Sequence, residues 1–205
     1  MKKIICLLLT LVCTFAFFAC GEGEATGEAA IVNIANSAEP TKITTIASYV
    51  IDDEVYNGEY VMLVNGNDSI FNFKYDRRAS VAEMADSYKI AEEGVVYYKN
   101  GLYSYDGAEW NSEAASAIKI DFNLDLALFD TYTLNGNTLD ATVSGENVAK
   151  VLGSDVAADG AVEISIVTNG THLSLIEVSY KTATGATVTV DTSYTYDAQE
   201  LVFPE

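Results

Sequence analysis

YVMLVNGNDSIFNFKY, residues 60–75, has the pattern of two β-strands joined by a tight turn. The central NGND, residues 65–68, is a hairpin turn signal, because Asn-Gly readily supplies the positive φ that such turns need. Side chains two residues apart share one face of a strand. The residues that this rule places on one apolar face are Tyr60, Met62, Val64, Phe71, Phe73 and Tyr75. The segment therefore predicts an antiparallel hairpin with an apolar face.

The same pattern extends over most of the chain. Residues 41–51 are rich in β-branched side chains, and a second hairpin signal, Lys99-Asn100-Gly101, separates two Tyr-rich runs. Asn135-Gly136-Asn137 is a further turn, and three alternating segments between 162 and 196 close the chain. Short strands joined by Gly-containing turns favour a mostly antiparallel sheet. We expect an α+β fold with a few short helices packed on one face.

Helices are expected at three places. Partial helical spacing predicts one at about 29–35, ended by Pro40, and a second at about 122–129. A third would begin at a Ser144 cap, bury Val148, Val151 and Leu152, and end at Gly153. Residues 76–93 are expected to form a loop or short helix. A face switch at Leu175-Ile176 indicates a β-bulge.

The N-terminus has the layout of an export signal. Lys2 and Lys3 precede an apolar run of about 15 residues, shorter than the roughly 20 that a membrane-spanning helix needs. Cys20 follows this run, and residues 21–24 are small and acidic. We expect residues 1–19 to be a signal peptide, residues 20–28 a flexible acidic tether, and residues 29–205 a single extracytoplasmic domain.

Phe17-Phe18-Ala19-Cys20 resembles the lipobox of bacterial lipoproteins, in which a small residue precedes the acceptor cysteine. The two phenylalanines depart from the family pattern of Leu and a small residue. The resemblance implies acylation of Cys20 (palmitate or a similar chain) and attachment to the cell membrane without a spanning helix. Two alternatives stay open at this point: an uncleaved N-terminal anchor and a soluble secreted product.

Composition excludes several classes of function. The formal net charge of −19 argues against nucleic-acid binding, because phosphates repel such a surface. Loss of residues 1–19 would leave Cys20 as the only cysteine, which excludes an intramolecular disulfide and a thiol-based metal site. His172 is the only histidine and follows an Asn-Gly-Thr turn. We therefore expect no metal, no cofactor and no enzymatic activity.

The order of the expected elements resembles the half-barrel of bacterial lipoprotein carriers of the LolA and LppX type. Residues 96–107, Trp110 and residues 178–204 also resemble Gram-positive lipoproteins of that general shape. The resemblance implies a strongly curved sheet around a cavity that holds acyl chains. The residues that we place in such a cavity are Tyr60, Met62, Phe71, Phe73, Tyr97, Tyr103 and Leu126.

Other interpretations of the same residues remain open. Alternating aromatic side chains are also the ordinary core face of a sheet, so the interior could be dry. The domain could then be a cell-surface interaction or structural module, acting through loops such as 76–87 and 106–116. An enzyme would need two carboxylates in a cleft, and pairs such as Asp52-Asp53 and Glu92-Glu93 are what an acidic composition alone produces.

Overall fold

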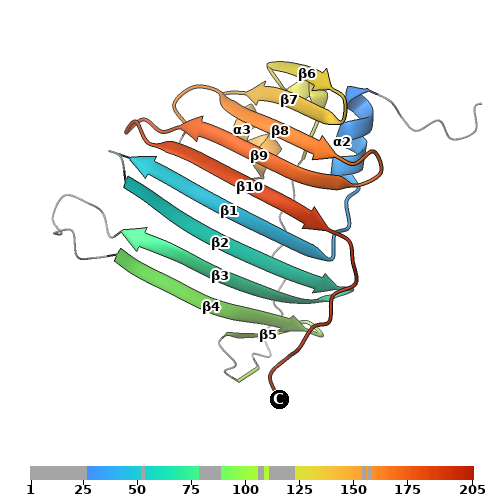
Figure 1. Cartoon of the computed structure of the whole chain (residues 1–205), viewed down its shortest axis with the longest axis vertical. Coiled ribbons are helices and arrows are strands. Elements are labelled where there is room, and N and C mark those ends of the chain that lie inside the picture. Colours follow the sequence, from blue (N-terminus) through green and yellow to red (C-terminus); the bar gives the residue numbers. More distant parts are fainter. Residues whose placement is uncertain are drawn as a thin grey trace, which may run out of the picture.

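The computed structural model describes residues 27–51, 54–78, 89–105, 109–110, 123–153, 156 and 158–205. In these residues the fold is an open, fully antiparallel sheet with few helices (Figure 1). The strand order is β5-β4-β3-β2-β1-β10-β9-β8-β7-β6. The expected α+β class with a mostly antiparallel sheet is confirmed at this level.

The strands are β1 (Lys42–Ile51), β2 (Glu54–Asn65), β3 (Asp68–Arg78), β4 (Lys89–Lys99), β5 (Leu102–Tyr105), β6 (Thr131–Asn135), β7 (Thr138–Val143), β8 (Val162–Thr168), β9 (Leu173–Lys181) and β10 (Thr187–Thr195). The helical elements are α2 (Glu28–Asn36), the 3₁₀ turn η1 (Leu126–Leu128) and α3 (Asn147–Leu152). Two meanders, β1–β5 and β6–β10, run outward from a central β1–β10 pair.

Tight turns connect the hairpins where the sequence indicates them. Asn65 pairs with Asp68, so the β2–β3 turn has two central residues, and Gly66 takes φ +63°. In the β4–β5 turn, Asn100 and Gly101 both have positive φ, at +52° and +78°. This is the conformation whose twist matches the flanking strands, and it explains the choice of Asn-Gly. These turns fix the register of the first meander.

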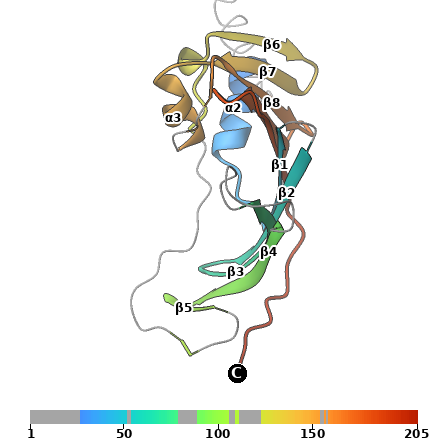
Figure 2. The same ribbon diagram turned by 90° about the vertical axis from the view of Figure 1, so that its left-hand side faces the viewer.

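The hydrophobic core lies at the β6–β10 end of the sheet. Helix α2 packs mainly on β7, β8, β9 and η1, and α3 packs on η1 (Figure 2). Ile31 of α2, Val151 of α3 and Ile166 of β8 belong to one cluster of buried side chains, in which Val151 and Ile166 are fully buried. The two short helices are too short to persist alone and are held by this packing.

The expected helix at 122–129 is wrong in extent. Residues 123–125 are irregular, and only the 3₁₀ turn η1 follows, capped by the Asp125 carboxylate, which accepts from the Ala127 N–H at 2.9 Å. The reason lies in tertiary hydrogen bonds. The Asn36 amide donates to the Leu124 C=O at 2.7 Å and accepts from its N–H at 3.1 Å. These backbone groups are thereby unavailable for a helix.

The expected Ser144 cap of α3 is also wrong. The helix begins at Asn147 after Glu146, because Gly145 has φ +59° and a residue in the left-handed region cannot start an α-helix. Its end is as predicted, with Gly153 in the left-handed conformation at φ +70°. Of the predicted buried face of α3, Val148 and Val151 are buried, and Leu152 is half-buried against the core.

Two strand boundaries differ from expectation. The segment 76–93 is strand at both ends, because β3 continues to Arg78 and β4 begins at Lys89; residues 79–88 lie outside the described residues. The bulge of β9 falls at Ser174, one residue before the predicted switch, since Val167 pairs with Leu175 and Thr168 with Leu173.

Among the described residues, no helix is long and apolar enough to cross a membrane.

Candidate functional site

The site is on the face of the sheet that α2 and α3 occupy at its other end, here called the inner face (Figure 2). Strand pairing defines this face. The core residues Ile166 and Ile176 lie in one row with Thr192 of β10. The same row continues through Thr45 of β1 to Tyr60 and then to Phe73 of β3. Aromatic side chains of β2 and β3 therefore extend the core face beyond the helices.

Aromatic rings contact one another along this part of the inner face. The centroids of Tyr60 and Phe71 lie 6.2 Å apart with their planes inclined by 13°, and Phe71 lies 6.0 Å from Phe73. Tyr98 and Tyr103, paired across β4 and β5, have centroids 6.5 Å apart. The rings are half-buried. Burial, and to a lesser degree Tyr103, raises the pKa of Tyr98 above its ordinary value.

Five of the seven predicted cavity residues share this inner face, as the strand pairing places them. They are Tyr60, Met62, Phe71, Phe73 and Tyr103. Tyr97 lies on the opposite face, because it pairs with Ile70 and Ser104. Leu126 belongs to η1 and packs on the core cluster at the far end of the sheet. Cys20 lies outside the described residues.

Tyr98 takes the position on the inner face that we had expected Tyr97 to hold. The run Val95-Val96-Tyr97-Tyr98 is apolar in both phases, so alternation alone does not choose between them. The turn does carry a signal. A two-residue Asn100-Gly101 turn makes Lys99 pair with Leu102 and Tyr98 with Tyr103, so Tyr97 cannot share a face with Tyr103.

The aromatic part of the inner face is distinct from the hydrophobic core. Among the described residues, the core cluster draws its strand residues from β6 to β10 and includes none from β2 to β5. Met62 is buried, with 6% of its surface exposed, and the surrounding aromatic side chains are half-buried. The inner face thus has two regions, a helix-covered core and an aromatic region on β2–β5, which we call the aromatic surface.

Several hydroxyl groups border the aromatic surface on the side of the core. Thr45 Oγ1 and Thr192 Oγ1 are hydrogen-bonded at 3.1 Å between the two regions. Ser69 Oγ and Tyr194 Oη are buried without a hydrogen-bond partner. Burial, with a smaller contribution from Tyr196, raises the pKa of Tyr194 far above its ordinary value. These groups are uncharged at neutral pH.

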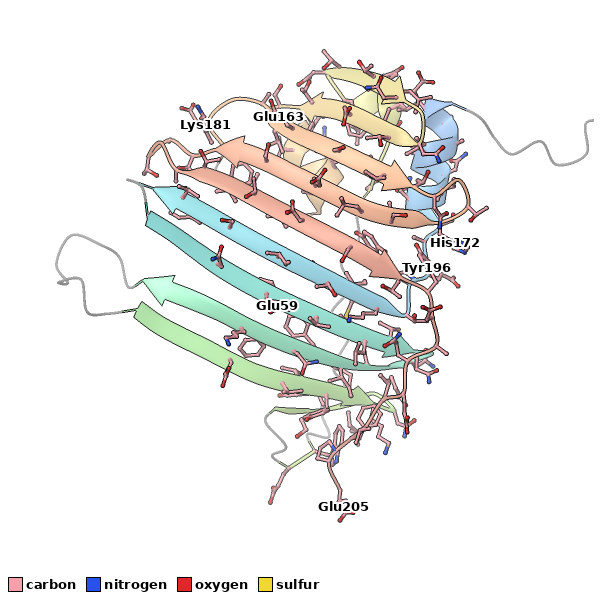
Figure 3. All side chains as sticks on the ribbon, in the orientation of Figure 1. Glu59, Glu163, His172, Lys181, Tyr196 and Glu205 are labelled. Atoms are coloured by element: carbon pink, nitrogen blue, oxygen red, sulfur yellow. The ribbon has the colours of Figure 1, made fainter. Side chains whose placement is uncertain are left out.

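Charged side chains gather on the outer face, which Figure 3 shows toward the viewer. Lys42, Lys74 and Lys99 all alternate with inner-face residues and therefore lie on this side. One row across the outer face contains Asp140, Ser165, Glu177, Asp191, Ile46, Glu59, Lys74 and Glu93. Ser165 donates to the Asp140 carboxylate at 2.7 Å.

Two shallow grooves lie on the outer face. One, of about 510 Å³, is lined by hydroxyls and by the carboxylates of Asp140, Glu163, Glu177 and Asp191. The other, of about 500 Å³, lies over β2–β4 between Glu59 and Glu93. Glu59 and Glu163, labelled in Figure 3, mark the two regions. Ile46, half exposed, lies between Asp191 and Glu59 in the row described above.

His172 occupies a different position, in the β8–β9 turn where the strands end, beside Tyr196 (Figure 3). The two rings have centroids 4.5 Å apart, and Tyr196 Oη donates to the Leu173 C=O at 3.0 Å. His172 Nδ1 lies 2.9 Å from Thr171 Oγ1. A small cleft of about 260 Å³ separates this pair from the end of α2. These contacts stabilise the β8–β9 turn.

In the part of the chain that the structure describes, no three His, Cys, Asp or Glu side chains are grouped so as to hold a metal ion. No protein-family model matches the chain, and no curated protein is significantly similar to it in sequence.

Proposed function

We propose that this chain is a lipid-anchored extracytoplasmic lipoprotein whose aromatic surface binds an acyl chain or another apolar ligand. The observation that carries the proposal is the position of Tyr60, Phe71 and Phe73. They continue the core face of the sheet, yet the core cluster of the described residues does not include them. Apolar surface removed from water by a ligand contributes about 25 cal/mol per Å² to binding.

The curvature of the sheet supports the proposal, because a curved sheet makes the aromatic surface concave. In Figure 2 the strands at the β5 end bend toward the side on which the helices lie. A half-barrel of this kind would wrap the aromatic surface around a ligand and bury more of it than a flat sheet would. Ligand sites are typically concave and lined by aromatic and apolar side chains with a few polar groups. The hydroxyls of Thr45 and Thr192 would border such a site.

The anchor proposal depends on Cys20 and on the apolar run that precedes it. One acyl chain binds a bilayer only marginally, whereas two or more hold a protein there stably. A diacylated Cys20 would keep the domain at the membrane surface, close to a supply of lipid. The acidic tether of residues 21–28 would separate the two.

Co-purified lipid tests the ligand proposal. The full chain is extracted from membranes in detergent, washed extensively with fresh detergent buffer and then treated with organic solvent. Mass spectrometry of the extract should reveal a reproducible apolar species in a molar ratio near one. The Phe71→Ala/Phe73→Ala variant, which lacks two rings of the aromatic surface, should retain several-fold less of this species. An empty wild-type protein that also takes up no added lipid would contradict the proposal.

Metabolic labelling tests the anchor separately. Cells that produce the full chain are fed an alkynyl palmitate, and the label is read out on a gel. The wild-type chain and a Cys13→Ala control should be labelled and should partition into detergent, whereas Cys20→Ala should do neither. Equal labelling of Cys20→Ala and wild type would refute lipidation at Cys20 and leave the ligand proposal untouched.

A surface interaction module is the second candidate function, and the outer face favours it. Its groove of about 510 Å³ carries Glu177 and Asp191 in one row, which suits a cationic partner. Three results together would support the module. The purified chain would contain no lipid, it would bind polylysine at physiological salt, and the Glu177→Gln/Asp191→Asn variant would lose that binding. Unchanged binding in that variant would rule out this face as the binding surface.

A further inference from the structure

Strand β6 ends the sheet that the described residues form and presents an open edge. Its five residues read TYTLN, with four of them exposed and only Leu134 half-buried. Edge strands in soluble proteins are usually protected by charged side chains, proline or a covering segment. Between Thr131 and Asn135 there is no charge and no proline. Within the described residues no strand pairs with the outer side of β6.

The hydrogen-bond pattern shows which backbone groups face outward. Asn135 pairs with Thr138 across the two-residue turn. The Asn137 C=O accepts from the Thr168 N–H at 3.0 Å, so Thr138 and alternate residues of β7 face β6. Alternation then directs the N–H and C=O of Tyr132 and Leu134 away from β7. No hydrogen bond to these groups occurs among the described residues.

The edge is complementary to itself. In an antiparallel pair centred on Thr133, Tyr132 of one copy faces Leu134 of the other, and the reverse holds by symmetry. Both side chains lie on the inner face, since Tyr132 pairs with Ala141 and Leu134 with Leu139 of the core. Tyr132 is one of the large hydrophobic residues that remain exposed, at 45%. The outward N–H and C=O groups would form roughly four hydrogen bonds across the seam.

We propose that β6 pairs antiparallel with β6 of a second copy of this chain, which joins two sheets into one across a two-fold axis at Thr133. A closed two-fold contact uses the same patch on both copies and stops at a dimer. The paired segment is short and lies below the size of interfaces that are stable in dilute solution. The dimer therefore forms where copies are concentrated, and on the proposed lipid anchor this is the membrane surface.

The position of helix α2 is compatible with a dimer at the membrane surface. Helix α2, which follows the proposed tether, packs on β7 and β8 near the β6 edge (Figure 1). In the paired arrangement the α2 helices of both copies lie on the same side of the joined sheet, because a two-fold axis perpendicular to the sheet keeps its faces. Both tethers would thus approach the seam from one face.

A disulfide across the two-fold axis tests the proposal. Thr133 would face Thr133 of the second copy as a non-hydrogen-bonded pair, with Cα atoms about 4.5 Å apart and within disulfide reach. The full chain carrying Thr133→Cys is oxidised in isolated membranes with copper-phenanthroline and oxygen, which take up the two electrons and two protons of the paired thiols. A reducible dimer should form at least about five-fold more than in wild type, which sets the baseline for Cys20.

Thr131→Cys is the matched control, an exposed threonine on the same strand and face. In the proposed register the two copies of residue 131 lie about 13 Å apart along the strands, beyond disulfide reach. Adding Tyr132→Pro to Thr133→Cys removes one outward N–H, which an edge strand tolerates, and should abolish the excess dimer without lowering the thermal midpoint. Equal cross-linking of Thr131→Cys and Thr133→Cys, or cross-linking of Thr133→Cys to a different protein only, would overturn the proposal.

Discussion

The ring of Phe203, near the C-terminus, packs against Tyr97 on the outer face of β4, with centroids 6.3 Å apart and planes inclined by 57°. Trp110 lies 6.2 Å from the same ring, and Lys99 Nζ lies 5.0 Å above it. Residues 196–205 leave β10 and pass the ends of β1, β2 and β3 to reach this position (Figure 1). This C-terminal strap ties the two meanders together.

Phe203→Ala should loosen the strap and destabilise the fold. Aromatic pairs contribute about 0.5–1.5 kcal/mol each beyond simple area burial, and Phe203 is half-buried with two such partners. We expect the free energy of unfolding to fall by about 1–3 kcal/mol in urea titrations. Trp110 is the only tryptophan, so its emission should shift to longer wavelength as its contact with Phe203 is lost.

Val202→Ala is the control for the strap, because Val202 is 73% exposed and next to Phe203. Its unfolding free energy should remain within about 0.5 kcal/mol of wild type, as for other surface substitutions. If both variants have the same stability and the same Trp110 emission as wild type, the strap is not a stabilising element.

Asn36→Ala should lower the free energy of unfolding, although Asn36 is the last residue of helix α2. Its side chain satisfies both backbone groups of Leu124, a residue with 2% exposure. Loss of the amide leaves those groups without a partner, at about 1–3 kcal/mol. Asn33→Ala on the exposed side of α2 is the control and should be nearly neutral. Equal stability of the two variants by urea unfolding would show that the bridge contributes nothing.

Local patterns predict most of the first meander and fail where tertiary contacts decide. The Asn-Gly turns and the alternation of Phe71 and Phe73 specify hairpins, because turn geometry and side-chain period are local properties. Leu124 shows the opposite case. Its neighbours have helical spacing, but a bond to Asn36, 88 residues away, holds the backbone in an irregular conformation. No local pattern reports such a partner.

The candidate site shows the same division. Tyr60, Met62, Phe71 and Phe73 share one face because β3 alternates clearly and the two-residue turn pairs Met62 with Phe71 and Tyr60 with Phe73. Tyr97 and Tyr98 are both aromatic, and only the register of the Asn100-Gly101 turn distinguishes them. No local pattern in residues 196–205 predicts the contact of Phe203 with β4, because the two are about 100 residues apart in the chain and meet only in the folded protein.

Tyr194→Phe should stabilise the protein and make its stability less dependent on pH above pH 10. The Tyr194 hydroxyl is buried without a hydrogen bond, so its removal should contribute about 1 kcal/mol at pH 7. Burial raises the pKa of Tyr194 in the folded state above the ordinary value of 10.0. The unfolded chain then loses this proton first, so stability is full below pH 10 and declines as the pH rises above it.

Urea unfolding at pH 7 to 11 measures both effects. Tyr194→Phe should lose less stability above pH 10 than wild type does, because one raised pKa is removed. Tyr132→Phe, at an exposed tyrosine, is the control for the loss of a hydroxyl and should leave the free energy of unfolding at pH 7 unchanged. Parallel pH curves for wild type and Tyr194→Phe would contradict the proposed burial of a neutral hydroxyl.

Binding of the uncharged fluorophore N-phenyl-1-naphthylamine to the purified full chain tests the central claim most directly. Wild type should bind it saturably, and Phe71→Ala/Phe73→Ala should bind about ten-fold more weakly, a loss of about 1.4 kcal/mol. Val61→Ala/Asn72→Ala, on the outer face of the same two strands, should bind as wild type does. Saturable binding that is equal in all three proteins, or no binding by wild type, would contradict a ligand site on the aromatic surface.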